Sequence, residues 1–400
     1  MKKKQSKKTK QENKKIKISN LFLVIIVALI FIGGFLKTVI FSEDINDYEN
    51  RTAYKYTKPT IKNITNKEFQ DNIELTLSDQ IPLSTTMKLK YNSINSFVNY
   101  NVMKAVTKNN CKDRYITMMP GLTTYDCDDT LVYFPSDLES RKVPVDSRIN
   151  NINKVIERDL ATVYVYYIET DSDIDFTTNE KTGVSDYLIE NLNTKNTHVY
   201  KINNFEEFSQ NFYKTDHHWK LTGSYKGYLE LAALLNVKTP LEKGEKKCVE
   251  TPFVGSKAYS AGAGDVYNEE FCIYEFDIPK HSITINGKEE KMYAARKASE
   301  IGWVAYGNGY GYDYAEIIFD YKQPKKENIL LIGESYDNAI LELIGSHYNK
   351  TYSIDLRHYE REFGEKFNYS EYVKEHDIDK VVFIGSMFYY SDETFNVEVE

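Results

Sequence analysis

An uncharged apolar segment near the N-terminus constrains what this chain can fold into more than any other feature. It runs from Ile18 to Leu36, and the 17 residues before it contain nine lysines and one glutamate. Nineteen helical residues span about 28 Å, close to the roughly 30 Å of hydrocarbon in a bilayer. A core helix of a globular domain rarely lacks a polar face over such a length. The sequence therefore predicts one transmembrane helix within residues 18–41.

The charges on either side of this segment predict its orientation. Residues 1–17 carry a net charge of +8, and the stretch 43–49 is acidic. By the positive-inside rule, we expect a basic cytoplasmic tail, a single-pass anchor in the cell membrane and an extracellular remainder. A cleaved signal peptide is the alternative. It is disfavoured because residues 41–43 form no small-x-small cleavage site.

The net charge of −8 hides a division at the membrane. The 383 residues after the tail contain 42 basic and 58 acidic side chains, a net charge of −16. An anionic body repels phosphate, so no nucleic-acid partner is expected. The 33 tyrosines and 20 phenylalanines provide ample apolar bulk for a folded core.

All four cysteines fall in the part predicted to be extracellular, where disulfides are permitted. Three pairings are possible. Local pairing of Cys111 with Cys127 and of Cys248 with Cys272 is the simplest, because both loops are short. No cysteine and histidine spacing indicates a zinc site, and no metal is expected.

The exported part begins with a polar stalk and entry segment, residues 42–110, and continues as a domain over 111–400. Short runs of β-branched and aromatic residues alternate there with helical patterns. This rhythm predicts βαβ units and an α/β fold with a mostly parallel, doubly wound sheet. The strands are expected at 131–134, 161–168, 198–202, 328–333, 351–356 and 380–385, and the helices at 147–160, 184–192, 222–235, 337–347 and 369–376.

Residues 240–325 interrupt this rhythm. Glycines, prolines and alternating patterns such as that of His281–Gly287 predict an inserted β-rich lobe. The glycine-rich stretch Gly302–Tyr314 resembles a phosphate loop only superficially, because it lacks the full motif with a helix behind it. Turns within the lobe are the better interpretation.

Two segments at expected strand ends carry reactive side chains. In the first, the strand 328–333 leads into Glu334, Ser335 and Tyr336, and a helix is expected to follow. A serine at such a turn exposes its hydroxyl near a helix N-terminus, where an oxyanion is stabilised. The alternative is a serine that only caps the helix. Asp337 excludes the lipase-type elbow motif.

The second segment contains Asp216, His217, His218 and Trp219. In an extended chain, residues i and i+2 point to the same side, so Asp216 and His218 are expected to share a cleft and His217 to face away. A carboxylate orients an imidazole so that it takes a proton from a serine hydroxyl. The alternative is that both histidines cap a helix or lie in the core.

A metal site at this segment would need a second acidic cluster. The loop with Asp171, Asp173 and Asp175 is the candidate, and a solvated acidic loop is its simpler interpretation.

Together the two segments resemble a known family. Asp216-His217-His218-Trp219, followed about 120 residues later by Gly333-Glu334-Ser335-Tyr336, looks like the DHHW proteins. These are related to the alginate O-acetyltransferase type of SGNH-hydrolase-like domain. The resemblance implies an αβα sandwich, with Ser335 as nucleophile, His218 as general base and Asp216 as the residue that orients it. Glu334 and Tyr336 depart from the usual Asp and Phe of the family.

The oxyanion hole of the family has no clear counterpart in this sequence. Asn338, Gly385 and Ser386 are candidates by position only. The resemblance implies a membrane-anchored O-acetyltransferase acting on a cell-surface polysaccharide, without a cofactor. It also implies a multi-pass membrane O-acyltransferase as the partner that supplies the acetyl group. An acetylesterase with the same triad and a non-catalytic glycan-binding or scaffold protein remain alternatives.

Overall fold

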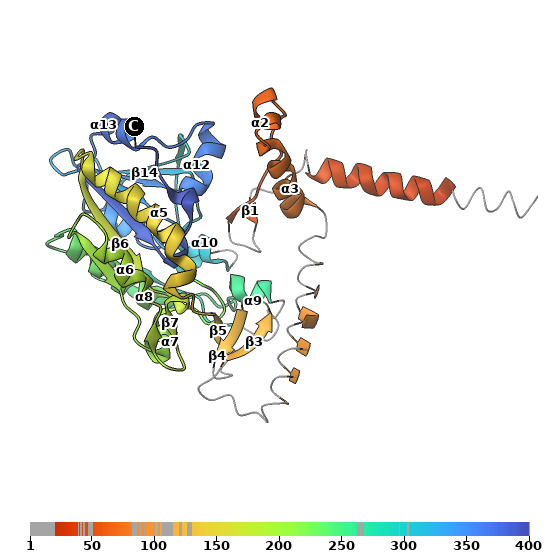
Figure 1. Ribbon diagram of the computed structural model, residues 1–400, viewed down its shortest axis with the longest axis horizontal. Coiled ribbons are helices and arrows are strands. Elements are labelled where there is room, and N and C mark those ends of the chain that lie inside the picture. The colour runs from red at the N-terminus through yellow and green to blue at the C-terminus, as the bar shows by residue number, and fades with distance from the viewer. Residues whose placement is uncertain are drawn as a thin grey trace, which may run out of the picture. The chain divides into compact units, whose positions relative to one another are not determined.

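The computed structural model (Figure 1) divides into two compact units, one of residues 1–46 and 52–88 and the other of residues 47–51 and 89–400. The structure describes residues 21–38, 40, 42, 45–46, 51–81, 87, 90–91, 93–95, 97–98, 101–102, 105, 115–119, 122–125, 130–261, 268–295, 297–301 and 304–399.

The first unit contains the apolar helix Leu21–Thr38, the one described helix that is long and apolar enough to cross a membrane. Membrane anchors and signal sequences share this length and hydropathy. Two further helices follow, α2 (Ile61–Thr65) and α3 (Glu68–Gln80). Thr60 caps α2, because its hydroxyl accepts a hydrogen bond from the Asn63 backbone N–H at 3.2 Å.

The second unit is organised by an eight-stranded sheet with the order β13-β12-β14-β16-β15-β17-β6-β9. The five strands from β16 to β9 run parallel, and the other three are antiparallel. The predicted mostly parallel α/β sheet is therefore confirmed. The strands are β6 (Thr162–Ile168), β9 (Thr197–Tyr200), β12 (Ser282–Ile285), β13 (Lys288–Glu290), β14 (Glu316–Asp320), β15 (Ile329–Ile332), β16 (Lys350–Ile354) and β17 (Lys380–Gly385).

Helices cover both faces of this sheet and form the two cores of an αβα sandwich. Alternate residues of β6 enter opposite cores, as the pleat requires. Tyr166 packs in one core with Leu231 of α8, and Tyr167 packs in the other with Ile152 of α5. The described helices of the unit include α5 (Leu138–Glu157), α6 (Val184–Glu190), α7 (Phe205–Asn211), α8 (Leu221–Leu234), α11 (Leu341–Gly345), α12 (Leu356–Phe363), α13 (Tyr369–Glu375) and α14 (Met387–Tyr390).

Helix α5 begins nine residues before the predicted start at Ser147, although Pro144 lies inside it. The Asp137 carboxylate caps it by accepting a hydrogen bond from the Ser140 backbone N–H at 2.8 Å. Its apolar positions Ile149 and Ile152 face the sheet. Burial of this face outweighs the one backbone hydrogen bond that the proline removes.

The segment 240–325 is rich in strands, but it is not a separate lobe throughout. Strands β14, β12 and β13 extend the main sheet in that order, and β14 pairs antiparallel with β16. The rest of the segment comprises β10 (Glu245–Cys248), α9 (Ser256–Ser260), β11 (Cys272–Glu275), a short 3-10 turn (Ala298–Glu300) and α10 (Tyr306–Tyr310). A small third core of aromatic side chains, including Phe253, Phe271 and Tyr306, holds this part together.

Cys248 and Cys272 form a disulfide between paired positions of β10 and β11. The proposed pairing of Cys111 with Cys127 lies outside the described residues.

Short strands complete the fold: β1 (Ile45–Asn46), β2 (Arg51–Thr52), β3 (Tyr115–Met119), β4 (Leu122–Tyr125), β5 (Thr130–Tyr133), β7 (Ile174–Asp175) and β8 (Glu180–Lys181).

The double variant Cys248→Ser/Cys272→Ser is expected to unfold at a lower temperature than wild type under non-reducing conditions. The bridge spans a sequence separation of 24 residues. A cross-link of that length stabilises by about 3 kcal/mol in the chain-entropy model. Differential scanning fluorimetry measures the change, and an unchanged melting temperature would contradict the stabilising role.

Candidate active site

Asp216, His218 and Ser335 form a continuous chain of hydrogen bonds. The His218 Nδ1 atom lies 2.6 Å from Asp216 Oδ1, and its Nε2 atom lies 2.8 Å from Ser335 Oγ. All three residues are buried, and Ser335 keeps 7% of its surface exposed. The structure therefore brings together residues that are 117 positions apart, in the arrangement by which an imidazole removes a proton from a hydroxyl.

Three hydrogen bonds satisfy the buried Asp216 carboxylate. Its Oδ1 accepts from the His218 backbone N–H at 2.9 Å and from the imidazole, and its Oδ2 accepts from the Ser256 backbone N–H at 2.7 Å. Burial acts to raise the pKa of Asp216, but its electrostatic interactions with the imidazoles of His218 and His217 and these hydrogen bonds hold it well below its usual range. An ionised Asp216 keeps the proton of His218 on Nδ1, which leaves Nε2 free to accept from Ser335.

His217 does not face away from the cleft, as the extended-chain argument predicted. The segment closes into a tight loop, because Phe212 and Trp219 pair as an antiparallel bridge and the Tyr213 N–H donates to the His218 carbonyl. The two imidazole rings consequently lie 3.8 Å apart. The His217 Nδ1 atom lies 2.8 Å from Ser256 Oγ. Burial lowers the pKa of His217 to about 3, so this ring stays neutral at physiological pH.

The same contacts bear on the metal interpretation of Asp216, His217 and His218. Their potential ligand atoms lie within 4.8 Å of one another. However, Nδ1 of each ring and both carboxylate oxygens are engaged in hydrogen bonds. Nε2 of His218 is directed to Ser335. The arrangement fits a proton-transfer chain better than a set of converging metal ligands.

A tyrosine outside both motifs supports the imidazole. The Tyr306 ring stacks on His218 with centroids 3.9 Å apart and an interplanar angle of 8°. Tyr306 begins α10, inside the stretch that the sequence assigned only to turns. No motif marks this residue, and one tyrosine among 33 carries no signal of its own.

Trp219 forms the floor of the loop. It is fully buried and meets Tyr336 edge-on, with ring centroids 5.9 Å apart. Gly223 and Gly227 of α8 make room for it. A Cβ atom on Gly227 would lie 2.6 Å from the indole ring. Trp219 therefore fixes the loop against α8, while Tyr306 is the residue that stacks on the imidazole.

The predicted helix after Ser335 begins later than expected. Residues 335–340 form consecutive turns, and α11 starts only at Leu341. No hydrogen bond from the Ser335 backbone N–H is found among the described residues. This N–H is consequently the available oxyanion donor at the nucleophile, without the dipole of a long helix behind it.

The three oxyanion-hole candidates are engaged elsewhere or set back from the serine. The Asn338 amide donates to Asp313 at 2.8 Å, and its oxygen accepts from Tyr293. Ser386 donates both its N–H and its hydroxyl to Glu334, at 2.7 and 2.6 Å. Gly385 ends β17 beside the ring of Tyr389. These contacts leave no free side-chain amide directed at Ser335 among these candidates.

A cavity of about 320 Å³ opens beside Ser335. Its wall includes His217, Ser386, Arg141 and Arg357. Arg357 binds Asp355 at 2.5 Å and Asp313 at 2.9 Å. The cavity thus brings the candidate nucleophile, a neutral imidazole and positive charge into one space.

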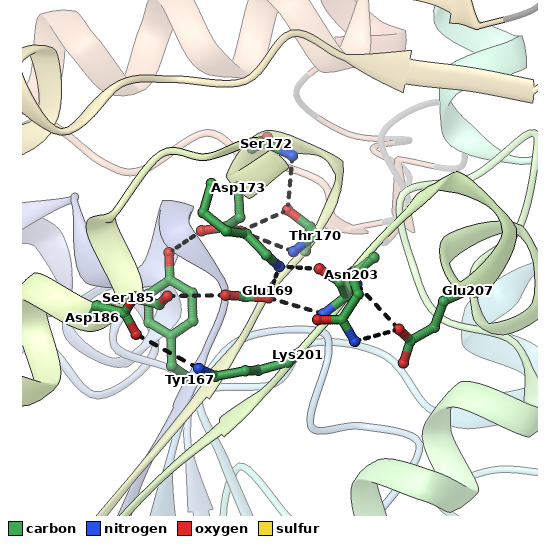
Figure 2. A network of polar contacts seen from close by, with 12 residues as sticks. Tyr167, Glu169, Thr170, Ser172, Asp173, Ser185, Asp186, Lys201, Asn203 and Glu207 are labelled. Atoms are coloured by element: carbon green, nitrogen blue, oxygen red, sulfur yellow. Dashed lines mark hydrogen bonds and ion pairs between the residues drawn. The ribbon is translucent and has the colours of Figure 1, made fainter. Parts of the chain in front are cut away.

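The acidic loop after β6 forms another part of this wall, and it is not solvated as predicted. Asp171 and Asp173 are each only 2% exposed. Asp171 pairs with the fully buried Lys257 at 2.6 Å. Asp173 accepts hydrogen bonds from the Tyr167 hydroxyl at 2.6 Å and the Thr170 N–H at 2.9 Å (Figure 2). The partly buried Asp175 accepts from Thr177.

Glu169 anchors the start of the same loop (Figure 2). Its carboxylate accepts from the Ser185 hydroxyl at 3.0 Å and the Ile202 N–H at 2.9 Å, and it pairs with Lys181. These partners come from three different segments of the chain. The network therefore holds the loop at the carboxyl ends of β6 and β9, where sites form in open α/β sheets.

No family model and no curated protein matches this sequence. Its fold is similar to solved structures. PatB1 from Bacillus cereus, solved with a sulfonyl adduct, gives a TM-score of 0.53 at 17% identity over 69% of this chain and 97% of that one. A DHHW family protein from Eubacterium siraeum gives 0.55 at 14% identity over 72% and 98%. The O-acetyltransferase domain of Pseudomonas putida AlgJ gives 0.38 at 9% identity over 66% and 90%.

The first two likenesses confirm the structural resemblance to the DHHW family and the SGNH-hydrolase-like fold class that the two motifs predicted. At these identities they establish the fold alone.

The loop network predicts a pH dependence of stability. Burial raises the pKa of Asp173 from 3.8 to about 7. The folded state therefore binds this proton more tightly than the unfolded chain. The stabilisation from Asp173 is complete below about pH 4 and is lost as the pH rises through about 7. Asp173→Asn is expected to lose less thermal stability than wild type between pH 5 and pH 8. Melting temperatures measured across this pH range check the prediction. An equal change with pH in the two proteins would contradict the role given to Asp173.

Proposed function

We propose that this chain is a membrane-anchored, extracytoplasmic O-acetyltransferase that modifies a cell-surface polysaccharide through Ser335, His218 and Asp216. The hydrogen-bonded chain from Asp216 through His218 to Ser335 carries the proposal. The adjoining cavity provides room for a donor and an acceptor in turn. The resemblance to DHHW proteins supports the choice of acetyl transfer.

The geometry allows a two-step transfer with one base. Ser335 Oγ attacks the acetyl carbonyl of the donor while its proton moves to His218 Nε2. The intermediate collapses, the donor leaves with that proton, and an acetyl ester remains on Ser335. A sugar hydroxyl then gives its proton to His218 and attacks the ester. The acetylated sugar leaves, and the proton returns to Ser335.

Charge develops on the carbonyl oxygen in both steps. In our proposal the Ser335 backbone N–H donates to it. Arg357 lines the same cavity, where Asp313 and Asp355 hold its guanidinium in place as a second donor. Because Asn338 and Ser386 are engaged elsewhere, these two groups replace a side-chain amide in our proposal.

The location of the domain limits how acetyl groups can reach the site. With the lysine-rich tail in the cytoplasm and the helix Leu21–Thr38 retained as an anchor, the site lies outside the cell. Acetyl groups must then be passed through the membrane. We propose that a multi-pass membrane O-acyltransferase supplies them, as the family resemblance implies.

Ser335→Ala and His218→Ala are expected to lose acyl release from p-nitrophenyl acetate by about a thousandfold, because they act as one unit. The full chain in detergent is compared with Ser209→Ala, a half-buried serine on α7 outside the cavity that is expected to keep wild-type activity. Peptide mass spectrometry should find acetyl, or the adduct of a sulfonyl fluoride, on Ser335. Equal rates in all four proteins would remove the catalytic proposal.

A second experiment adds a glycan and separates a transferase from an esterase. A transferase places the acetyl group on the sugar, whereas an esterase releases free acetate.

Tyr306→Leu is expected to reduce acyl release between about tenfold and a hundredfold, because a small displacement of the base is costly. Tyr306→Phe keeps the ring and should stay within about threefold of wild type. Rates and melting temperatures are measured together, so that a folding defect is recognised. A wild-type rate in Tyr306→Leu would show that the stacked ring does not position His218.

A further inference from the structure

The charged groups around the cavity differ in whether they are neutralised. Arg357 is paired with Asp313 and Asp355, and Asp171 is paired with Lys257. Arg141 lines the same cavity but has no carboxylate partner among the described residues. Its one hydrogen bond there is a donation to the Ser136 hydroxyl at 3.2 Å. A half-buried guanidinium with unused donors is an anion-binding group.

Helix α5 and the acidic loop after β6, which begins at Glu169, hold Arg141 in place. Arg141 lies in the first turn of α5, which is capped by Asp137. Ser136, its hydrogen-bond partner, donates its backbone N–H to the Ser172 carbonyl of that loop at 3.0 Å. The guanidinium is therefore attached to two rigid elements rather than to a mobile surface segment.

Two exposed aromatic rings line the cavity with Arg141. Tyr133 is 38% exposed and Phe388 is 51% exposed. One face of the Tyr133 ring meets Lys257, whose Nζ atom lies 4.7 Å from the ring centroid. Exposed aromatic faces beside hydrogen-bonding groups are the usual platforms for sugar rings, whose C–H faces are apolar.

We propose that the acceptor is an anionic glycan, whose carboxylate or phosphate binds Arg141 while its sugar rings lie on Tyr133 and Phe388. The proposal rests on the function proposed above. It assigns a substrate class to the same site and makes Arg141 the residue that selects it. The net charge of −16 on residues 18–400 would by itself favour a neutral glycan. Exposed charges are largely screened beyond about 8 Å at physiological ionic strength, so a local cation can outweigh it.

The test measures glycan binding without catalysis. Isothermal titration calorimetry with full-length Ser335→Ala in detergent compares tetragalacturonate with its methyl ester, and maltotetraose phosphate with maltotetraose. At least one anionic probe is expected to bind about tenfold more tightly than its neutral counterpart, the effect of one charged hydrogen-bonded pair. The probe that shows the preference identifies carboxylate or phosphate as the group.

Three further variants in the Ser335→Ala background assign the preference to one residue. Arg141→Gln is expected to abolish it, and Arg141→Lys to retain part of it. Lys154→Gln, which removes an exposed charge from the same helix away from the cavity, is expected to keep it. Melting temperatures verify that each variant is folded.

Equal binding, or absence of binding, of charged and neutral probes would overturn the inference. So would a preference that survives Arg141→Gln. Acyl release in wild type is measured separately. Its absence alongside charge-dependent binding would remove the proposed catalysis and leave the glycan site standing.

Discussion

A buried carboxylate must be matched by hydrogen-bond donors, and this requirement at Asp216 organises the candidate site. Its donors come from His218 and from Ser256 at the start of α9, so the carboxylate joins the motif loop to the 240–325 segment. The same segment supplies Tyr306, which covers one face of His218. An apparent insertion is therefore part of the site. Without it, the Asp216 carboxylate would lose a donor and the imidazole would lose its stacking partner.

The parallel core of the sheet was predictable because its strands are buried on both faces and read as unbroken apolar runs. β15 and β17 lie within a residue or two of their predicted bounds. The segment 240–325 was recognised as β-rich, but the attachment of its strands to the main sheet through β14 and β16 was not. Local patterns determine whether a segment is extended. They do not determine which edge of a sheet it joins, which depends on contacts distant in sequence.

The residues of the site also divide into those that the sequence predicts and those that depend on contacts distant in sequence. Asp216, His218 and Ser335 were found because motif spacing and residue type point to one chemistry. The features missed all depend on three-dimensional closure. His217 turns into the cleft because a bridge between Phe212 and Trp219 bends the loop. Asp171 is buried because Lys257, 86 residues away, neutralises it. A run of acidic residues is read as solvated unless its partner is known, and sequence alone does not supply that partner.

Glu334 explains why Ser386, one of the oxyanion-hole candidates, is unavailable. Burial raises the pKa of this carboxyl, and the positive charge of Arg357 opposes that rise. It takes both donors of Ser386, a reasonable outcome because an unsatisfied buried carboxylate costs more than a lost exposed hydrogen bond. In the proposed mechanism, one backbone N–H and the guanidinium of Arg357 therefore act on the developing oxyanion in place of several converging amides. The two arginines of the cavity differ, because Arg357 is paired with carboxylates and Arg141 has no such partner among the described residues. In our proposals Arg141 therefore binds the acceptor, while Asp313 and Asp355 hold Arg357 near the candidate nucleophile.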